Sequence, residues 1–150
     1  MTDGLGTNIV VQVGIIVKDI QKTLDGYVDV LGLEKCPDII LTDGPDKSNM
    51  KYRGKTSEAV AKLAFVHMGQ VDIELIEPVG GPSTWKEFLD EHGEGVHHIA
   101  FFVKGTDQVV AYLEGKGIAK VQQGDYTGGM YTYMDSAAKL GVMLELLENF

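Results

Sequence analysis

Two stretches of the chain share one pattern of polar and apolar positions. Gln12 to Lys18 and His98 to Lys104 each begin with a polar residue, continue through apolar residues and end in lysine. Successive side chains of a strand point to opposite faces, so Gln12 and His98 take the same position in two similar strands. A second pair of strand-like stretches, 71–77 and 142–148, places Glu74 and Glu145 at matched positions in the same way. The pattern predicts a duplicated structural unit.

Helical periodicity follows the first strand of each repeat. Apolar residues recur at helical spacing over 20–31, between Asp19 as the expected N-cap and Gly32. A second helix is expected after Thr106, and a short one after Ser83 or Thr84, where Thr84 and Glu87 have the spacing of a capping box.

Each half therefore reads strand–helix–strand–strand–strand, which predicts an α+β fold. We expect one domain over residues 1–150, built from two tandem βαβββ modules that form a curved mixed sheet around a metal-containing cleft. Module one covers about 8–78, a connector with a helix about 79–93, and module two about 94–148. The spacing differs between the halves, which indicates an insertion in the first half, within the polar stretch 42–57. Residues 124–129 are expected to form a flexible loop.

Composition narrows the class of protein. The 150 residues are 44% hydrophobic, enough for a core, and no apolar run is long enough to span a membrane. The start lacks the basic and apolar segments of a signal peptide, so a cytoplasmic protein is expected. The single cysteine excludes an internal disulfide, and the net charge of −9 argues against nucleic acid as a partner.

The matched polar residues are the candidate chemistry. Gln12, Glu74, His98 and Glu145 interrupt apolar strands on the face away from the helices. Two carboxylates placed close together repel, unless a proton or a cation lies between them. A divalent metal bound by these four residues would relieve that repulsion and leave positions open for substrate. The alternative is a hydrogen-bonded core histidine with solvated glutamates; His97, on the opposite face, is interpreted as structural.

Basic residues concentrate between 47 and 62, in contrast to the rest of the chain. Lys51 and Arg53, the only arginine, are candidate substrate-binding residues for an anionic tail, although a solvated loop would have the same composition. Phe102, Met130 and Tyr133 are candidates for lining the cleft, although core packing is the alternative for each.

Several segments resemble the vicinal oxygen chelate superfamily, which contains glyoxalases, bleomycin-resistance proteins and dioxygenases. Residues 73–78, 93–101 and 141–146 look most like the methylmalonyl-CoA epimerase branch. That branch begins its metal set with histidine, where this chain has Gln12, and its second catalytic glutamate has no clear counterpart here. Leu63 lies near the expected place, and Glu58 is earlier in the chain. Gln12, Glu74, His98 and Glu145 instead resemble the ligand set of glyoxalase I (lactoylglutathione lyase).

The resemblance implies a metal-dependent lyase or isomerase that moves a proton at a carbon next to a carbonyl. It implies a divalent ion (Zn, Ni, Co or Mn), Glu145 as general base with Glu74 as its partner, a thioester or thiol adduct as substrate, and a homodimer. A metal-free binding protein of the bleomycin-resistance type is the alternative. An extradiol dioxygenase fits least, because its iron needs two histidines.

Overall fold

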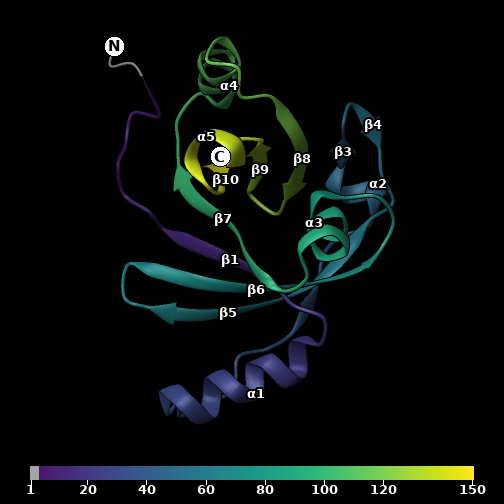
Figure 1. Cartoon of the computed structure of the whole chain (residues 1–150), viewed down its shortest axis with the longest axis vertical. Coiled ribbons are helices and arrows are strands. Elements are labelled where there is room, and N and C mark those ends of the chain that lie inside the picture. Colours follow the sequence, from purple (N-terminus) through teal and green to yellow (C-terminus); the bar gives the residue numbers. More distant parts are fainter. Residues whose placement is uncertain (1–3) are drawn as a thin grey trace.

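Ten strands form one mixed, curled sheet in the computed structural model, which describes residues 4–150 (Figure 1). Their order across the sheet is β2-β5-β6-β1-β7-β10-β9-β8-β3-β4. The strands are β1 (Gln12–Ile16), β2 (Ile40–Leu41), β3 (Lys51–Tyr52), β4 (Lys55–Thr56), β5 (Val60–Met68), β6 (Val71–Gly80), β7 (Gly95–Phe102), β8 (Lys120–Tyr126), β9 (Gly129–Met134) and β10 (Met143–Asn149). The helices are α1 (Ile20–Leu31), α2 (Pro45–Ser48), α3 (Thr84–His92), α4 (Thr106–Gly115) and α5 (Ala137–Leu140).

The two halves of the sheet are built alike. β1 runs parallel to β6 in the first half, as β7 runs parallel to β10 in the second, and β1 and β7 pair antiparallel where the halves meet. Within each half the chain order is strand, helix, then three strands, apart from the short elements α2, β3 and β4 in the first half and α5 in the second. The predicted α+β class with two βαβββ modules is confirmed.

The helix boundaries follow local capping: the structure selects Ser83 from the two starts offered for α3, and it corrects one prediction, at Thr106. Asp19 accepts a hydrogen bond from the Lys22 amide and Gly32 ends α1 in the left-handed region, as predicted. Ser83 is the side-chain cap of α3, because its hydroxyl accepts from the Lys86 amide. Thr106 is the first residue of α4 and not its cap. The predicted loop at 124–129 is also wrong, since β8 and β9 extend into it and leave a tight turn.

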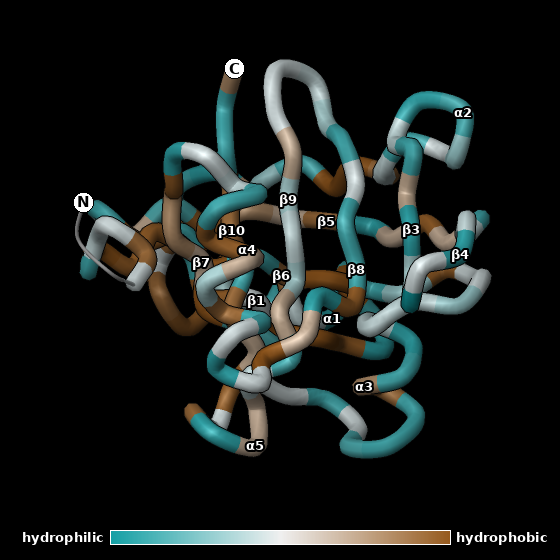
Figure 2. Tube along the Cα trace, turned by 90° about the horizontal axis from the view of Figure 1, so that it is seen from above, coloured by the Kyte–Doolittle hydropathy of each residue, from teal (hydrophilic) through white to brown (hydrophobic). Residues whose placement is uncertain are grey.

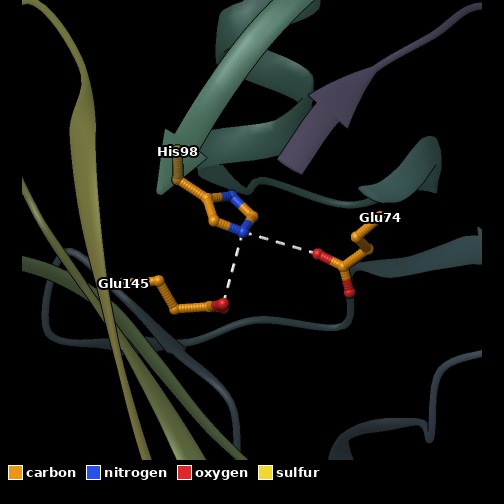
Figure 3. A group of neighbouring side chains, drawn as sticks. All are labelled: Glu74, His98 and Glu145. Atoms are coloured by element: carbon orange, nitrogen blue, oxygen red, sulfur yellow. Dashed lines mark ion pairs between the residues drawn. The ribbon is translucent and has the colours of Figure 1, made fainter. Parts of the chain in front are cut away.

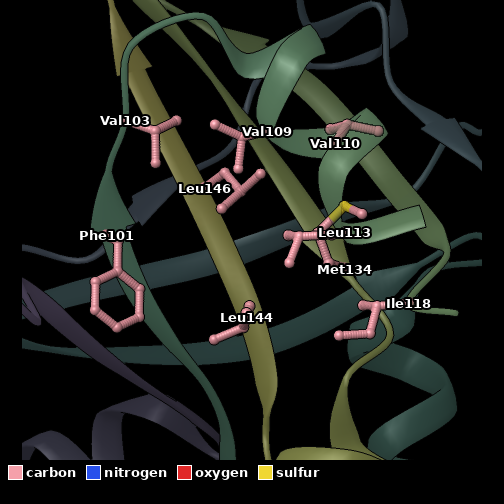
Figure 4. Close-up of a cluster of buried hydrophobic side chains, with 9 residues drawn as sticks. All are labelled: Phe101, Val103, Val109, Val110, Leu113, Ile118, Met134, Leu144 and Leu146. Carbon is pink, nitrogen blue, oxygen red and sulfur yellow. The ribbon is translucent and has the colours of Figure 1, made fainter. Parts of the chain in front are cut away.

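Each half buries the apolar face of one long helix against the outer face of its strands. α1 packs over β5 and β6, and α4 packs over β7, β9 and β10 (Figure 1). Leu144 and Leu146 of β10 face α4, so Glu145 between them faces the other side of the sheet. Figure 4 shows the second of these clusters, formed by Phe101, Val103, Val109, Val110, Leu113, Ile118, Met134, Leu144 and Leu146.

The insertion of the first half, residues 42–59 between β2 and β5, crosses over to the second half. Its strand β3 pairs with β8, with Lys51 opposite Gln123 and Tyr52 opposite Gln122. In Figure 2 the segment around α2 is hydrophilic and peripheral, whereas β7 and β10 in the middle are hydrophobic. The insertion therefore extends the sheet at its second-half end. None of the helices within residues 4–150 is long and apolar enough to cross a membrane.

Candidate metal centre

Four polar side chains meet near the middle of the sheet, one from each of four adjacent strands, β6, β1, β7 and β10. His98 of β7 has its Nε2 atom 3.2 Å from Glu145 Oε1 of β10 and 3.5 Å from Glu74 Oε1 of β6 (Figure 3). Gln12 of β1 brings its amide oxygen to 2.9 Å from the same nitrogen. The structure thus brings together all four residues that the sequence analysis offered as metal ligands.

The orientation of the Gln12 amide is expected to differ between the metal-free and the metal-bound site. The terminal amide atom of Gln12 that faces the carboxylates lies 2.8 Å from Glu145 Oε1 and 3.2 Å from Glu74 Oε1. An amide oxygen in this place faces only acceptors, whereas the nitrogen, after a half-turn of the amide, donates to both carboxylates. We therefore expect the nitrogen to face the carboxylates in metal-free protein, and the oxygen to face a bound cation.

Burial sets the protonation of the site. Glu74, His98 and Glu145 are all buried. Burial raises the pKa of Glu145 to about 8, and burial together with the charge of Glu145 holds the pKa of Glu74 well above its usual range. Burial lowers the pKa of His98 to about 3. The imidazole is therefore neutral at pH 7, and the carboxylates need either a proton or a metal cation.

The donor atoms are spaced as metal ligands are. Zinc and similar ions hold nitrogen and oxygen ligands at about 2.0–2.2 Å, so adjacent ligand atoms lie about 2.8–3.6 Å apart. The distances from His98 Nε2 to Gln12, Glu145 and Glu74 are 2.9, 3.2 and 3.5 Å. The donor set contains one imidazole, one amide and two carboxylates, a combination that suits a divalent transition metal or zinc. The residues present therefore fit the implied ion.

An irregularity in β7 places a second imidazole against the first. Gly14 pairs with His98, but the next residue of β1, Ile15, pairs with Val96, so His97 is an extra residue in β7. Its ring is buried, with Nδ1 2.8 Å from His98 Nδ1 and Nε2 3.2 Å from Thr84 Oγ1. The expectation that His97 points away from the site, on simple alternation, is corrected by this bulge.

These contacts define one consistent set of tautomers. A metal ligand at His98 Nε2 needs that nitrogen unprotonated, so the proton is on Nδ1 and is donated to His97 Nδ1. His97 then carries its proton on Nε2 and donates it to the Thr84 hydroxyl. His97 thus orients the ring of His98 and fixes its tautomer.

A glycine makes room for the ring of His98. A side-chain carbon added at Gly14 would lie 2.0 Å from His98 Cε1 and 2.5 Å from Nε2. Non-bonded carbon atoms pack at about 3.5–4.0 Å, so even alanine would displace the ring. Gly14 is required here because of this close approach and not for its backbone flexibility.

A cavity of about 590 Å³ opens beside the four residues. Phe102 and Tyr133, both offered as lining residues, line it. The Tyr133 hydroxyl accepts a hydrogen bond of 3.0 Å from Trp85 Nε1, and Trp85 also lines the cavity. The remaining lining residues include Leu63, Phe65, Tyr131 and Leu147 on the strands and Ser48, Met50 and Ala59 from the insertion.

The other three candidate substrate-binding residues lie elsewhere in the part of the chain described. Arg53 forms an ion pair of 2.9 Å with Glu87 of α3, and Lys51 donates to the Thr56 hydroxyl of β4. Met130 is half-buried in β9. None of the three is among the residues that line the cavity, and their contact with substrate stays a prediction.

Sequence reasoning missed three residues that shape this site: His97, Gly14 and Trp85. Adjacent histidines in a strand and a glycine inside an apolar strand were visible signals. The contacts that give them meaning depend on the pairing of β1 with β7, which no local pattern specifies.

This architecture, two βαβββ modules with a polar cluster between them, defines a class of protein. Residues 11–133 match the model of the Glyoxalase/Bleomycin resistance protein/Dioxygenase superfamily, and the chain belongs to this superfamily.

Individual relatives are more distant. An uncharacterized protein of Bacillus subtilis, YqjC, is 27% identical over 140 residues, which are 91% of this chain and 89% of the relative. The structure resembles methylmalonyl-CoA epimerase from Mycobacterium tuberculosis, with a TM-score of 0.67, 22% identity and coverage of 100% of this chain and 93% of the other. The hypothetical protein BH1468 from Bacillus halodurans gives a TM-score of 0.65 at 24% identity, with 94% of each chain covered. A Streptomyces coelicolor methylmalonyl-CoA epimerase variant in complex with 2-nitronate-propionyl-CoA gives 0.64 at 21% identity, covering 95% of this chain and 97% of the other.

Proposed function

We propose that the protein is a metal-dependent lyase or isomerase that moves a proton at a carbon next to a carbonyl group, as epimerases and glyoxalase I do. Gln12, Glu74, His98 and Glu145 would hold one divalent ion. The observation that carries the proposal is the pair of buried carboxylates, Glu74 and Glu145, which flank one neutral imidazole at the inner end of a cavity.

The bound ion would supply a positive charge that stabilises the oxygen of the substrate as negative charge develops on it. Glu145 is the proposed general base. Its carboxylate lies beside an apolar cavity wall, and in the metal-free site burial raises its pKa to about 8. A bound cation would lower this pKa again, so burial and the ion together would tune the group for proton transfer. Tyr133 borders the same carboxylate and is itself held by Trp85, so the base is positioned by a rigid aromatic pair.

Glu74 is the proposed partner of Glu145 on the opposite half of the sheet. The two carboxylates approach His98 from different strands (Figure 3), so substrate bound between them would have one carboxylate on each side. The preceding strand, β5, contributes apolar Leu63 and Phe65 to the cavity and no carboxylate. Proton movement therefore depends on Glu74 and Glu145 alone among the lining residues near the site.

The finer predictions extend this proposal. The substrate class implied by the resemblance is a thioester or a thiol adduct, and the complexes of similar folds named above include a CoA-based ligand. A homodimer is proposed on the resemblance only.

The test is hydrogen–deuterium exchange at the acidic carbon of candidate substrates, with bound metal measured in the same samples. Protein purified without chelator should hold about one divalent ion per chain, and His98→Ala should lose most of it. Glu145→Gln keeps the shape and one oxygen ligand but cannot accept a proton, so metal should remain while exchange falls by about 10²–10⁴-fold.

Each possible failure has a distinct meaning. Unchanged metal content in His98→Ala would contradict the metal site. Wild-type exchange by metal-loaded Glu145→Gln would contradict the role of the base. Tight binding of a ligand without any exchange, in wild type and variant alike, would favour the metal-free binding protein. Glu58→Gln, at an exposed position of the insertion, is the matched control and should retain both metal and exchange.

A further inference from the structure

The charges that line the cavity are all of one sign. Four carboxylates line it, Glu74 and Glu145 at the candidate metal centre and Asp43 and Asp125 farther out. Within residues 4–150, no lysine and no arginine lines the cavity. A bound metal ion would neutralise the inner pair, which leaves Asp43 and Asp125 as the charges that an extended substrate meets.

The outer end of the cavity lies well away from the metal centre. Asn149 lines the cavity four residues beyond Glu145 on β10, which corresponds to about 13 Å along a strand. Asn149 pairs with Gly129 and Gly129 pairs with Tyr126, the residue that follows Asp125 in β8. This end of the cavity is therefore formed by the last residues of β10 and the turn between β8 and β9.

The insertion of the first half forms the facing wall, and it is firmly attached. Asn49 donates a hydrogen bond of 3.0 Å to Asp125 Oδ2. Arg53 and Tyr52 both bind the Glu87 carboxylate of α3. These contacts join the insertion to β8 and α3, so the wall has a defined shape.

The attachment also accounts for the positions of the basic residues. Arg53 is neutralised by Glu87, and Lys51 is bonded to Thr56 on the exposed side of the β3–β4 hairpin. Of the basic stretch 47–62, the residues that line the cavity are neutral (Ser48, Met50 and Ala59), and the acidic Asp43 lies just before this stretch.

Ser48 adds a hydrogen-bonding feature to this wall. It lines the cavity at the end of α2, it is buried, and its hydroxyl has no hydrogen-bond partner among residues 4–150. Buried hydroxyl groups nearly always have a partner. A hydrogen-bonding group of a ligand in this part of the cavity would supply one after a rotation of the side chain.

We propose that the part of the substrate that lies in the outer end of the cavity, about 13 Å from the metal centre, is an amine or a hydroxyl group, held by Asp43, Asp125 and Ser48, and not a carboxylate or a phosphate. This inference rests on the proposed function for its inner anchor. It assigns specificity to the insertion, which has no counterpart in the second half.

The experiment uses hydroxamic acids, whose two oxygens chelate metals, with chains that differ only in the terminal group. Hexanoic and octanoic hydroxamates ending in ammonium, hydroxyl or carboxylate are titrated into metal-loaded protein, and the dissociation constants are measured by calorimetry. Trp85, the only tryptophan, lines the cavity, so its fluorescence reports binding independently of the metal. Two chain lengths separate an effect of reach from an effect of charge.

We expect the ammonium probe to bind best and the carboxylate probe worst. Their dissociation constants should differ by about tenfold, since each of the exposed charges of Asp43 and Asp125 changes affinity by up to about fivefold. Asp125→Asn should reduce this ratio and Ser48→Ala should weaken the hydroxyl probe. Lys55→Gln, at an exposed position of β4 away from the cavity lining, is the matched control and should change neither. Raising the salt concentration should also reduce this ratio, because salt screens solvent-exposed charges such as those of Asp43 and Asp125.

Two results would overturn the inference while leaving the proposed function intact. The first is equal binding of the three probes. The second is that the carboxylate probe binds most tightly and that Lys51→Gln weakens its binding. Failure of every hydroxamate to bind metal-loaded, folded protein would instead contradict the proposed metal chemistry, and the inference with it. If the ammonium probe is still preferred in Asp125→Asn and Asp43→Asn, the inference that these two residues hold the terminal group is wrong.

Discussion

Metal-free protein should lose stability as the pH rises, and Glu145→Gln should reduce that loss, leaving the part that buried Glu74 causes. Burial raises the pKa of Glu145 to about 8 in the folded chain, whereas an exposed glutamate titrates near 4.3. The folded state therefore binds this proton more tightly than the unfolded state. The stability gained is complete below about pH 4 and is lost as the pH rises to about 8, because stability falls wherever the folded state holds more protons.

The magnitude follows from the two pKa values. The difference between about 8 and about 4.3 corresponds to about 5 kcal/mol of unfolding free energy, of which about 3–4 kcal/mol is already lost at pH 7. Both glutamates are buried, with exposed fractions of 7% for Glu74 and 4% for Glu145, so solvent screens their charges little. Small domains are stable by only about 5–15 kcal/mol, and the loss would be a large share of the total. A bound divalent ion should abolish it, because the cation replaces the proton.

The assay is urea unfolding between pH 5 and 8, followed by Trp85 fluorescence, with chelator in one series and zinc in the other. Wild type with chelator should show a falling midpoint, while Glu145→Gln should show a clearly smaller fall, because only Glu74 then holds a proton in the buried site. Glu58→Gln, exposed on the insertion, should behave as wild type. A constant midpoint for chelated wild type, or an equal fall in Glu145→Gln, would refute the reasoning that connects burial to the proton.

Three further outcomes follow from single residues. Gly14→Ala should displace the His98 ring and reduce zinc affinity by at least about tenfold, measured by competition with a chromophoric chelator, while Gly26→Ala, in open space on α1, should not. His97→Ala should weaken zinc binding by about 10–100-fold with little change in the far-ultraviolet circular dichroism, and histidine exchange signals in NMR should show a mixture of His98 tautomers; unaltered affinity would exclude the orienting role. Leu146→Ala, at a fully buried position under α4, should cost about 2–5 kcal/mol in urea unfolding without loss of zinc.

Duplication explains how much of this molecule could be predicted from its sequence. Alternation in a strand fixes which face each residue takes, so Glu145 between Leu144 and Leu146 could be assigned to the face opposite the helix. The matched position of Glu74 then indicated that both carboxylates face one site. Helix boundaries at Asp19 and Gly32 were readable because capping is local.

The features that could not be predicted depend on contacts between distant segments. The extra residue at His97 exists only because β7 pairs with β1 in a particular register, and a bulge reverses the face predicted by alternation. The insertion read as a basic loop, yet Arg53 is bound to Glu87 of α3, more than thirty residues away. The positions of basic residues in the sequence did not predict the charge of the cavity lining, because ion pairs and hydrogen bonds to distant segments determine where these side chains point.

The pairing of β3 with β8 also governs how the sheet ends. Both outer strands, β2 and β4, are only two residues long. Without the insertion the seven-residue strand β8 would be the boundary, with a row of unpaired backbone groups open to another chain. The segment that forms the outer wall of the cavity is thus also a cap against self-association through strand addition. Loop shortening would threaten solubility, so new substrate preferences can evolve here more readily by replacing side chains than by deleting residues.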